Sequence, residues 1–170
     1  MKSKKRQRYY THAILINSHL CGLIGMQTSL SWLFLLFTPF SLMLSTFLLF
    51  YHQTAYSRNF WLFCLSIFLL GYGVEVAGIH TGLVFGVYSY GQTLGFKLAD
   101  VPLVMGLNWL NLIYCIGVVF NKLKLKFWLK SLIGAITLTL LDFLIEPIAI
   151  RYDYWSWESV TVPTQNYIAW

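Results

Sequence analysis

Two carboxyl residues stand four positions apart in a stretch of the sequence that is otherwise apolar. At this spacing Asp142 and Glu146 share one face of a helix, and Pro147, which follows at once, interrupts the helical hydrogen bonds. Two carboxylates this close should not both ionise in a dry site, so we expect one to keep its proton at neutral pH and to serve as a proton donor. The alternative is an interfacial pair that an outer loop simply leaves wet.

A third carboxyl, Glu75, lies in a glycine-rich part of another apolar stretch. A carboxylate in lipid costs a few kcal/mol or more, so Glu75 should face the inside of a helix bundle. Gly71, Gly78 and Gly82 recur near its face and would allow close contact with another helix. His80 follows about one turn later. Both residues could take part in chemistry, or Glu75 could be a structural carboxyl bonded to a neighbouring helix and His80 a hydrogen-bonded structural residue.

Amide and aromatic residues accompany these carboxyls. Asn108 and Trp109 lie in a later apolar stretch and Asn166 opens the last one; asparagine in a membrane helix often only bridges two helices. The segment 152–157, which contains Trp155, is typical of an aromatic belt at a membrane surface and could also form part of a lid. The cysteines and histidines show no metal-ligand spacing, so we expect no metal site.

The composition indicates the kind of protein that holds these residues. Apolar residues make up 58% of the chain and charged residues 11%, against roughly 45–50% and about 25% in soluble domains. The charges are too few to cover a soluble globule, and the hydrophobicity is too high for a disordered chain. An integral membrane protein remains. The net charge of +6 gathers in short clusters rather than on a soluble domain, which argues against a nucleic-acid partner.

The apolar runs predict an all-α, polytopic bundle of five to six transmembrane helices, which forms a single domain over residues 1–170. We expect a kink in the second run at Pro39. A sixth span begins at Val162 and is cut short at Trp170, or else lies in the interface. The five complete runs are 13–27, 30–50, 60–79, 101–120 and 127–150.

Lysine and arginine predict the orientation, because they are enriched on the cytoplasmic side. A cytoplasmic amino terminus, with a basic tail at 1–12, puts nine of the twelve basic residues inside and predicts a protein of the cell (inner) membrane. The same orientation puts all six acidic residues in the outer half or the outer loops: Glu75, Asp100, Asp142, Glu146, Asp153 and Glu158. The outer loop at 80–100 is rich in glycine and tyrosine, and we expect it to fold over or into the outer end of the bundle.

Several motifs follow one another in the second part of the chain. They are Glu75-Val76-Ala77-Gly78-Ile79-His80-Thr81-Gly82, Phe85-Gly86-x-Tyr88-x-Tyr90, Leu94-Gly95, Val101-Pro102-Leu103, Asn108-Trp109, Asp142-x-x-x-Glu146-Pro147, Tyr154-Trp155-Ser156-Trp157 and Val162-Pro163-x-x-Asn166-Tyr167-x-x-Trp170. In this order they resemble the CruF-type carotenoid hydratases, a family of carotenoid biosynthesis membrane proteins. The resemblance covers roughly residues 70–170, and the first 70 residues match only in hydropathy.

The resemblance implies a hydro-lyase that needs no cofactor and adds water to the terminal 1,2 double bond of an acyclic carotenoid end. Such a substrate dissolves in the lipid bilayer and can enter from the side, and other carotenoid-pathway enzymes could be partners. Asp142 or Glu146 would donate the proton while the other tunes or restores it, and Glu75 and His80 would position the water or act as its base. The residues expected to position substrate and water are Asn108, Trp109, Asn166, Tyr88 and Trp155.

Two other function classes fit the same residues. Intramembrane carboxylates also mark ion paths, so a proton-coupled transporter is one alternative, although we find no internal repeat. A non-catalytic subunit that binds carotenoid or assembles pathway enzymes is the other. The mass of the pigment separates these classes, because only a hydratase adds the mass of water to its substrate.

Overall fold

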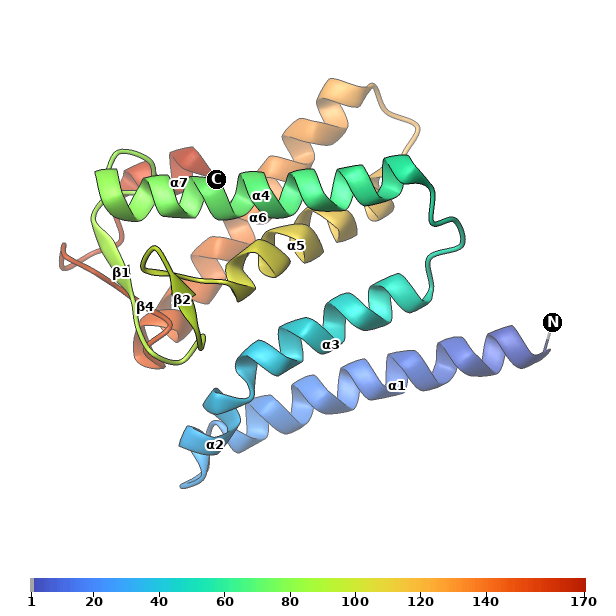
Figure 1. Ribbon diagram of the computed structural model, residues 1–170, viewed down its shortest axis with the longest axis horizontal. Coiled ribbons are helices and arrows are strands. Elements are labelled where there is room, and N and C mark those ends of the chain that lie inside the picture. Colours follow the sequence, from blue (N-terminus) through green and yellow to red (C-terminus); the bar gives the residue numbers. More distant parts are fainter. Residues whose placement is uncertain (1) are drawn as a thin grey trace. The chain divides into compact units, whose positions relative to one another are not determined.

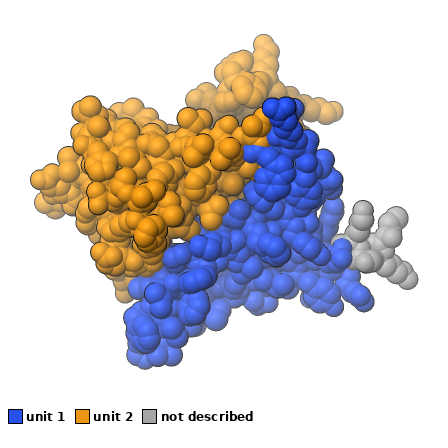
Figure 2. Space-filling model, in the orientation of Figure 1, with its two compact units in different colours: residues 1–61 blue, residues 62–170 orange. Residues whose placement is uncertain are grey.

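The computed structural model describes residues 2–170, with side chains from residue 6 onward, and the chain forms two compact units. The first unit is Met1–Trp61 and the second is Leu62–Trp170. Figure 1 shows the course of the chain, and Figure 2 colours the two units separately. The carboxyl residues singled out above all belong to the second unit.

The first unit contains the helices α1 (Lys2–Gly25), α2 (Ser31–Leu36) and α3 (Thr38–Tyr51), and α1 packs against the other two. The run that we expected to kink at Pro39 is instead divided at Phe37. Pro39 then falls in the first turn of α3, where its missing N–H leaves no helical hydrogen bond unmade. A hydrogen bond of 2.7 Å between His52 Nε2 and the buried Thr11 Oγ1 ties α1 to the end of α3.

Three helices that lie wholly or mostly in the second unit are long and apolar enough to cross a membrane. They are α4 (Arg58–Thr81), α5 (Val104–Asn121) and α6 (Phe127–Arg151), and their bounds agree closely with three of the predicted runs. Only 22–28% of the most apolar stretch of each helix is buried within the protein, so most of this apolar surface faces outward. The protein is therefore mostly helical, and its long apolar helices indicate an integral membrane protein.

Glycines bring these three helices close together. A Cβ added at Gly71 of α4 would overlap the ring of Trp109 on α5, and one at Gly106 of α5 would overlap Phe68 of α4. On α6, a Cβ at Gly134 would lie 2.9 Å from Ile116 of α5. Gly71 thus permits the close helix contact that the sequence predicts.

The other two glycines near Glu75 act differently from the prediction. Gly78 faces Phe85 and the hydroxyl of Tyr88, which belong to the loop after α4 and not to another helix. Gly82 has φ +65 and ends α4, because only glycine enters this left-handed conformation without a steric cost.

Four short strands depart from the predicted all-α class. β1 (Tyr88–Tyr90) pairs antiparallel with β4 (Trp155–Trp157), and β2 (Lys97–Leu98) forms a hairpin with β3 (Val101–Pro102). Aromatic residues in alternation favour an extended ribbon over a helix, and both Tyr-Ser-Tyr and Trp-Ser-Trp alternate in this way. The β1–β4 ribbon joins two segments that are far apart in the sequence, so hydropathy alone does not reveal it.

The hairpin and a short final helix complete this end of the second unit. Tyr72 of α4 donates its hydroxyl to the carbonyl oxygens of Leu98 at 2.6 Å and Val101 at 3.0 Å, which fixes the hairpin on α4. The helix α7 (Thr164–Ala169) packs against α6. Gln165 of α7 donates its amide to the carbonyl oxygens of Gly82 and Leu83. These contacts bring α4, α6 and α7 together around one space.

Candidate functional site

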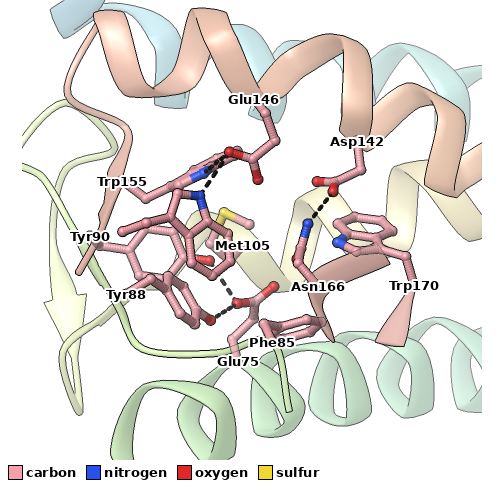
Figure 3. Close-up of a pocket in the computed structure, with 11 residues that line it drawn as sticks. Glu75, Phe85, Tyr88, Tyr90, Met105, Asp142, Glu146, Trp155, Asn166 and Trp170 are labelled. Atoms are coloured by element: carbon pink, nitrogen blue, oxygen red, sulfur yellow. Dashed lines mark hydrogen bonds between the residues drawn. The ribbon is translucent and has the colours of Figure 1, made fainter. Parts of the chain in front are cut away.

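A cavity lies at this end of the second unit, between α4, α6, α7 and the β1–β4 ribbon (Figure 3). Together with its open mouth, it encloses about 310 Å³ of space that no protein atom fills. Its lining consists of carboxyl, aromatic and amide side chains with one methionine: Glu75, Phe85, Tyr88, Tyr90, Met105, Asp142, Glu146, Trp155, Trp157, Asn166 and Trp170.

Glu75 accepts hydrogen bonds on both of its oxygens. Tyr88 and Tyr90 donate their hydroxyls to Oε2 at 2.6 and 2.7 Å, and Trp109 donates its indole N–H to Oε1 at 2.8 Å. The ring of Trp109 in turn stacks on Trp170, with 4.6 Å between ring centroids. Glu75 is only 4% exposed, and its three donors satisfy a carboxyl that would otherwise be costly to bury.

Glu146 is bonded on one oxygen alone. The indole N–H groups of Trp155 and Trp157 both donate to Oε2, at 3.1 and 2.9 Å. The side chain is 2% exposed, yet Oε1 accepts no hydrogen bond from the residues that the structure describes. In Figure 3 this second oxygen points into the space between the three carboxyl groups.

Asp142 has a single donor. The amide of Asn166 donates to Asp142 Oδ2 at 2.5 Å, and these side chains are 2% and 5% exposed respectively. The position of Asn166 is set by α7, where its backbone N–H donates to the carbonyl oxygen of Pro163 at 3.0 Å. Asp142 Oδ1 accepts nothing from the described residues and lies on the cavity side (Figure 3).

The ribbon connects two of these carboxyls. In its register Tyr88 lies opposite Trp157, and Tyr90 lies opposite Trp155. Alternate residues of a strand point to the same face, so all four aromatic donors face inward: the tyrosines to Glu75 on α4 and the tryptophans to Glu146 on α6. Ser89 and Ser156 face outward, where their hydroxyls lie 3.2 Å apart. The ribbon is thus a clamp between α4 and α6.

Burial keeps the two tyrosines of the ribbon in their neutral form. Burial raises the pKa of Tyr90 well above its ordinary value, and the neighbouring Glu75 raises it further. The pKa of Tyr88 is raised by the same two causes in the same order. Both hydroxyls therefore remain hydrogen-bond donors to Glu75 throughout the neutral range.

The structure brings together most of the site residues that the sequence predicts. Asp142, Glu146, Glu75, Asn166, Tyr88 and Trp155 all line the cavity, and Trp109 reaches it through its hydrogen bond to Glu75. Their convergence depends on the ribbon and on α7, which carry three of the predicted residues between them: Tyr88, Trp155 and Asn166.

His80 and Asn108 are not among the lining residues. His80 follows Glu75 by five residues, which turns its side chain by about 140° around the helix. It is half exposed, and its Nε2 lies 4.0 Å from a carboxylate oxygen of Asp100. Asn108 is half-buried on α5. We therefore leave both residues out of the chemistry proposed below.

Five lining residues were not assigned from the sequence: Phe85, Tyr90, Met105, Trp157 and Trp170. The signal for two of them is the alternation of Tyr88 with Tyr90 and of Trp155 with Trp157, because residues two apart on a strand share a face. Trp170 follows Asn166 by four residues, one turn of helix later. Phe85 and Met105 carry no comparable signal.

The arrangement offers acid–base chemistry in an aromatic chamber. Two carboxyl oxygens, Glu146 Oε1 and Asp142 Oδ1, face the cavity without a protein donor, so either can hold a proton or exchange one with a bound molecule. The aromatic faces can stabilise positive charge. Among the described residues, no group of three or more His, Cys, Asp or Glu side chains is arranged to hold a metal ion.

Comparison with known proteins identifies the family. A family model described as "Carotenoid biosynthesis protein" matches residues 30–170, so the match begins well before the motifs at 70–170. The chain is 27% identical over 149 residues to bisanhydrobacterioruberin hydratase of Haloarcula japonica, an alignment that covers 80% of this chain and 51% of that protein. The chain thus spans about half the length of this curated relative. No solved structure matches the chain. With most of its length matched, including every residue of the cavity, the chain belongs to the carotenoid biosynthesis protein family.

Proposed function

We propose that this protein is a carotenoid hydratase, a hydro-lyase that adds water to the terminal 1,2 double bond of an acyclic carotenoid end. The observation that carries the proposal is the meeting of three buried carboxyls in one aromatic-lined cavity of a carotenoid biosynthesis protein. A trisubstituted alkene is a poor base, so hydration needs a carboxylic acid that is held in a dry site and is close to the double bond.

Asp142 is the proposed proton donor. It accepts one hydrogen bond, from Asn166, whereas Glu146 accepts two and Glu75 three. A carboxyl with fewer donors needs the least rearrangement to carry a hydrogen on its free oxygen and present it to the cavity. Glu146, one helical turn away on the same face of α6, restores the proton after each turnover.

Protonation of C2 leaves a cation at C1, which is the more substituted carbon. The rings of Tyr88, Trp157 and Trp170 are among those that face the cavity, and they stabilise this charge by cation–π attraction. The negative charge shared by the carboxyls acts in the same direction. Both effects are strongest for the cation and weak for the neutral alkene, which is what lowers the barrier to the reaction.

Water capture completes the reaction. A water molecule held by Glu75 adds its oxygen to C1, and the proton that it loses passes to a cavity carboxylate, so that the net change is the addition of one water and the acid is regenerated. The product is a tertiary alcohol at C1. Tyr88 and Tyr90 fix Glu75 through their hydroxyls and so fix the water that it holds.

Expression in a host that accumulates an acyclic-ended carotenoid tests this function. We expect the pigment to gain the mass of one water molecule at each end that reacts. Asp142→Asn and Glu75→Gln should each abolish the gain, and Glu158→Gln, which changes an exposed carboxyl outside the cavity, should retain it. Pigment of unchanged mass with the wild-type chain would favour a transporter or a non-catalytic subunit instead.

We also propose five to six spans in the cell (inner) membrane, with the amino terminus in the cytoplasm. The three long apolar helices α4, α5 and α6 support three of these spans. The additional spans would include α1 and the pair α2–α3. The shorter apolar helix Thr38–Tyr51 supports the second of these, and the cluster of basic residues before Ala13 supports the orientation.

A further inference from the structure

The lining of the cavity combines negative charge with aromatic faces and contains no positive side chain. Six of its eleven described residues are aromatic, three are carboxyls, and none is Lys, Arg or His. A nearby lysine, Lys97, turns its ammonium to the backbone carbonyl oxygen of Tyr90 and is not part of the lining. Nothing in the described lining therefore neutralises the carboxyl groups.

Two of the carboxyls also keep an oxygen free for a ligand. Glu146 Oε1 and Asp142 Oδ1 accept no hydrogen bond from the described residues, although the side chains are only 2% and 5% exposed. No buried side-chain oxygen or nitrogen is left without a partner among the described residues. The free oxygens are therefore not sealed in the interior but open into the cavity, as Figure 3 shows for both.

We propose that this cavity is a binding site for an organic cation: a dimethylalkylammonium group at the end of a long apolar chain. The faces of tryptophan and tyrosine attract an alkylated ammonium, most strongly when the site is desolvated. The free carboxyl oxygen accepts the N–H of the same group. The alkyl tail of the ligand extends from the cavity to the apolar surface of the helices, where it can lie in lipid.

The inference rests on the proposed function in one respect, because a protonated dimethylamine matches the shape and charge of the cation at C1, with its two methyl groups and its chain. A stable cation of this form should bind more tightly than the neutral end of the substrate, since the site complements the charged intermediate. Binding itself requires no turnover and can be measured separately from hydration.

The test measures binding to the purified full-length protein in lipid nanodiscs. The probe is N,N-dimethyldodecylamine, and the matched neutral control is N,N-dimethyldodecanamide, which has a similar length and the same methyl groups. Tryptophan fluorescence reports occupancy, because Trp155, Trp157 and Trp170 line the cavity. We expect saturable binding of the amine that is at least about tenfold tighter than that of the amide.

Variants place the binding in the cavity. Glu146→Gln and Asp142→Asn should each weaken binding of the amine, and the exposed Glu158→Gln should leave it unchanged. Equal binding of amine and amide by the wild-type protein, or an equal loss in Glu158→Gln, would overturn the inference without requiring any cavity variant to fold. Amine binding without hydration of the pigment would refute the proposed function alone. Hydration of the pigment without amine binding would refute this inference alone.

Discussion

At the scale of single residues, the site depends on aromatic side chains whose one polar group donates a hydrogen bond to a carboxyl. Tyr88, Tyr90 and Trp109 converge on Glu75, and each is a neutral donor with a large apolar body. Such residues can be buried at little cost when their one polar group is satisfied. The rings of Tyr88 and Tyr90 therefore serve twice, because they line the cavity and also hold a carboxyl in place, whereas Trp109 holds the same carboxyl without lining the cavity.

The buried tyrosines predict a loss of stability at high pH. Burial and the neighbouring Glu75 raise the pKa of Tyr88 and Tyr90 above the value of about 10 that they have in the unfolded chain. Below that pH both states are protonated and the stability is retained. Above it the unfolded chain ionises and the folded chain does not, so the free energy of unfolding falls as pH rises.

Alkaline spectrophotometric titration, combined with thermal unfolding in detergent, checks this prediction. At least two of the eleven tyrosines should resist ionisation until the protein unfolds. The double variant Tyr88→Phe, Tyr90→Phe should remove those two from the resistant group. Ionisation of all eleven tyrosines while the helices remain intact would contradict the burial described here.

Some residues of the site can be predicted from the sequence more readily than others. The carboxyls Glu75, Asp142 and Glu146 are recognisable because a charged residue in an apolar run needs a reason to be there. Composition alone does not mark their partners, because tyrosine and tryptophan at a membrane surface are expected in any case; Tyr88 and Trp155 are expected at the site only through the family resemblance. The register of the two strands decides which indole donates to which carboxyl oxygen, and the local composition does not predict the register.

At the scale of elements, the β1–β4 ribbon determines whether the carboxyls face one another. It carries donors on one face and serines on the other, so the two faces can be tested separately. Trp157→Phe keeps the ring and removes an N–H donor to Glu146. A hydrogen bond to a charged group contributes about 1.5–3 kcal/mol, so we expect a clear loss of thermal stability and of hydration activity.

Ser156→Ala on the same strand is the matched control. Its hydroxyl faces away from the cavity and is paired with that of Ser89. Exposed substitutions of this kind usually change stability by no more than about 0.5 kcal/mol. If Ser156→Ala proved as harmful as Trp157→Phe, the loss would reflect the strand as a whole and not the inward donors.

The β2–β3 hairpin contains backbone strain that can be relieved. Its two turn residues, Ala99 and Asp100, have φ values of 48° and 62°, and an L residue in this left-handed region costs roughly 1–2 kcal/mol. Glycine at position 99 would relieve this strain. Glycine also loses more conformational freedom on folding than alanine does, which offsets part of the gain by roughly 0.5–1 kcal/mol. Ala99→Gly should therefore stabilise the protein, by about 0.5–1 kcal/mol.

Thermal unfolding compares this variant with Ala77→Gly in the exposed face of α4. The helical substitution should have the opposite sign and destabilise the protein by about 1 kcal/mol. A lower unfolding temperature for both variants would show that Ala99 is not strained. The comparison uses the same chemical change at two positions, so a general effect of added glycine cannot imitate the result.

The long helices were predictable and the connections were not. Apolar runs at 60–79, 101–120 and 127–150 contain the whole signal for α4, α5 and α6, because length and hydropathy alone define a span. The strands β1 and β4 are three residues long and pair across more than sixty positions of sequence. Their pairing follows from tertiary contacts with Glu75 and Glu146, which no window of sequence contains.

At the scale of the whole second unit, charge is divided between the two ends of the helices. α4 and α6 end, and α5 begins, beside the ribbon, and all six acidic residues lie at or near that end. The opposite end has the short connection between α5 and α6, which contains Lys122, Lys124 and Lys126. In the proposed membrane arrangement the cavity therefore lies close to one membrane surface, where the proposed carotenoid substrate would present its end and keep its polyene chain in the lipid.

This polarity predicts which surface holds the cavity. Lysine-rich connections remain in the cytoplasm, so the loop with Lys124 should be inside and the segment after β4 outside. With Cys21, Cys64 and Cys115 replaced by alanine, the exposed positions Lys124→Cys and Ser159→Cys report the two sides. In intact cells a membrane-impermeant maleimide should label only the cysteine at 159, and the one at 124 should react after permeabilisation. The reverse pattern would place the carboxyl cavity at the cytoplasmic surface, and labelling of both from outside would mean that α6 does not cross the membrane.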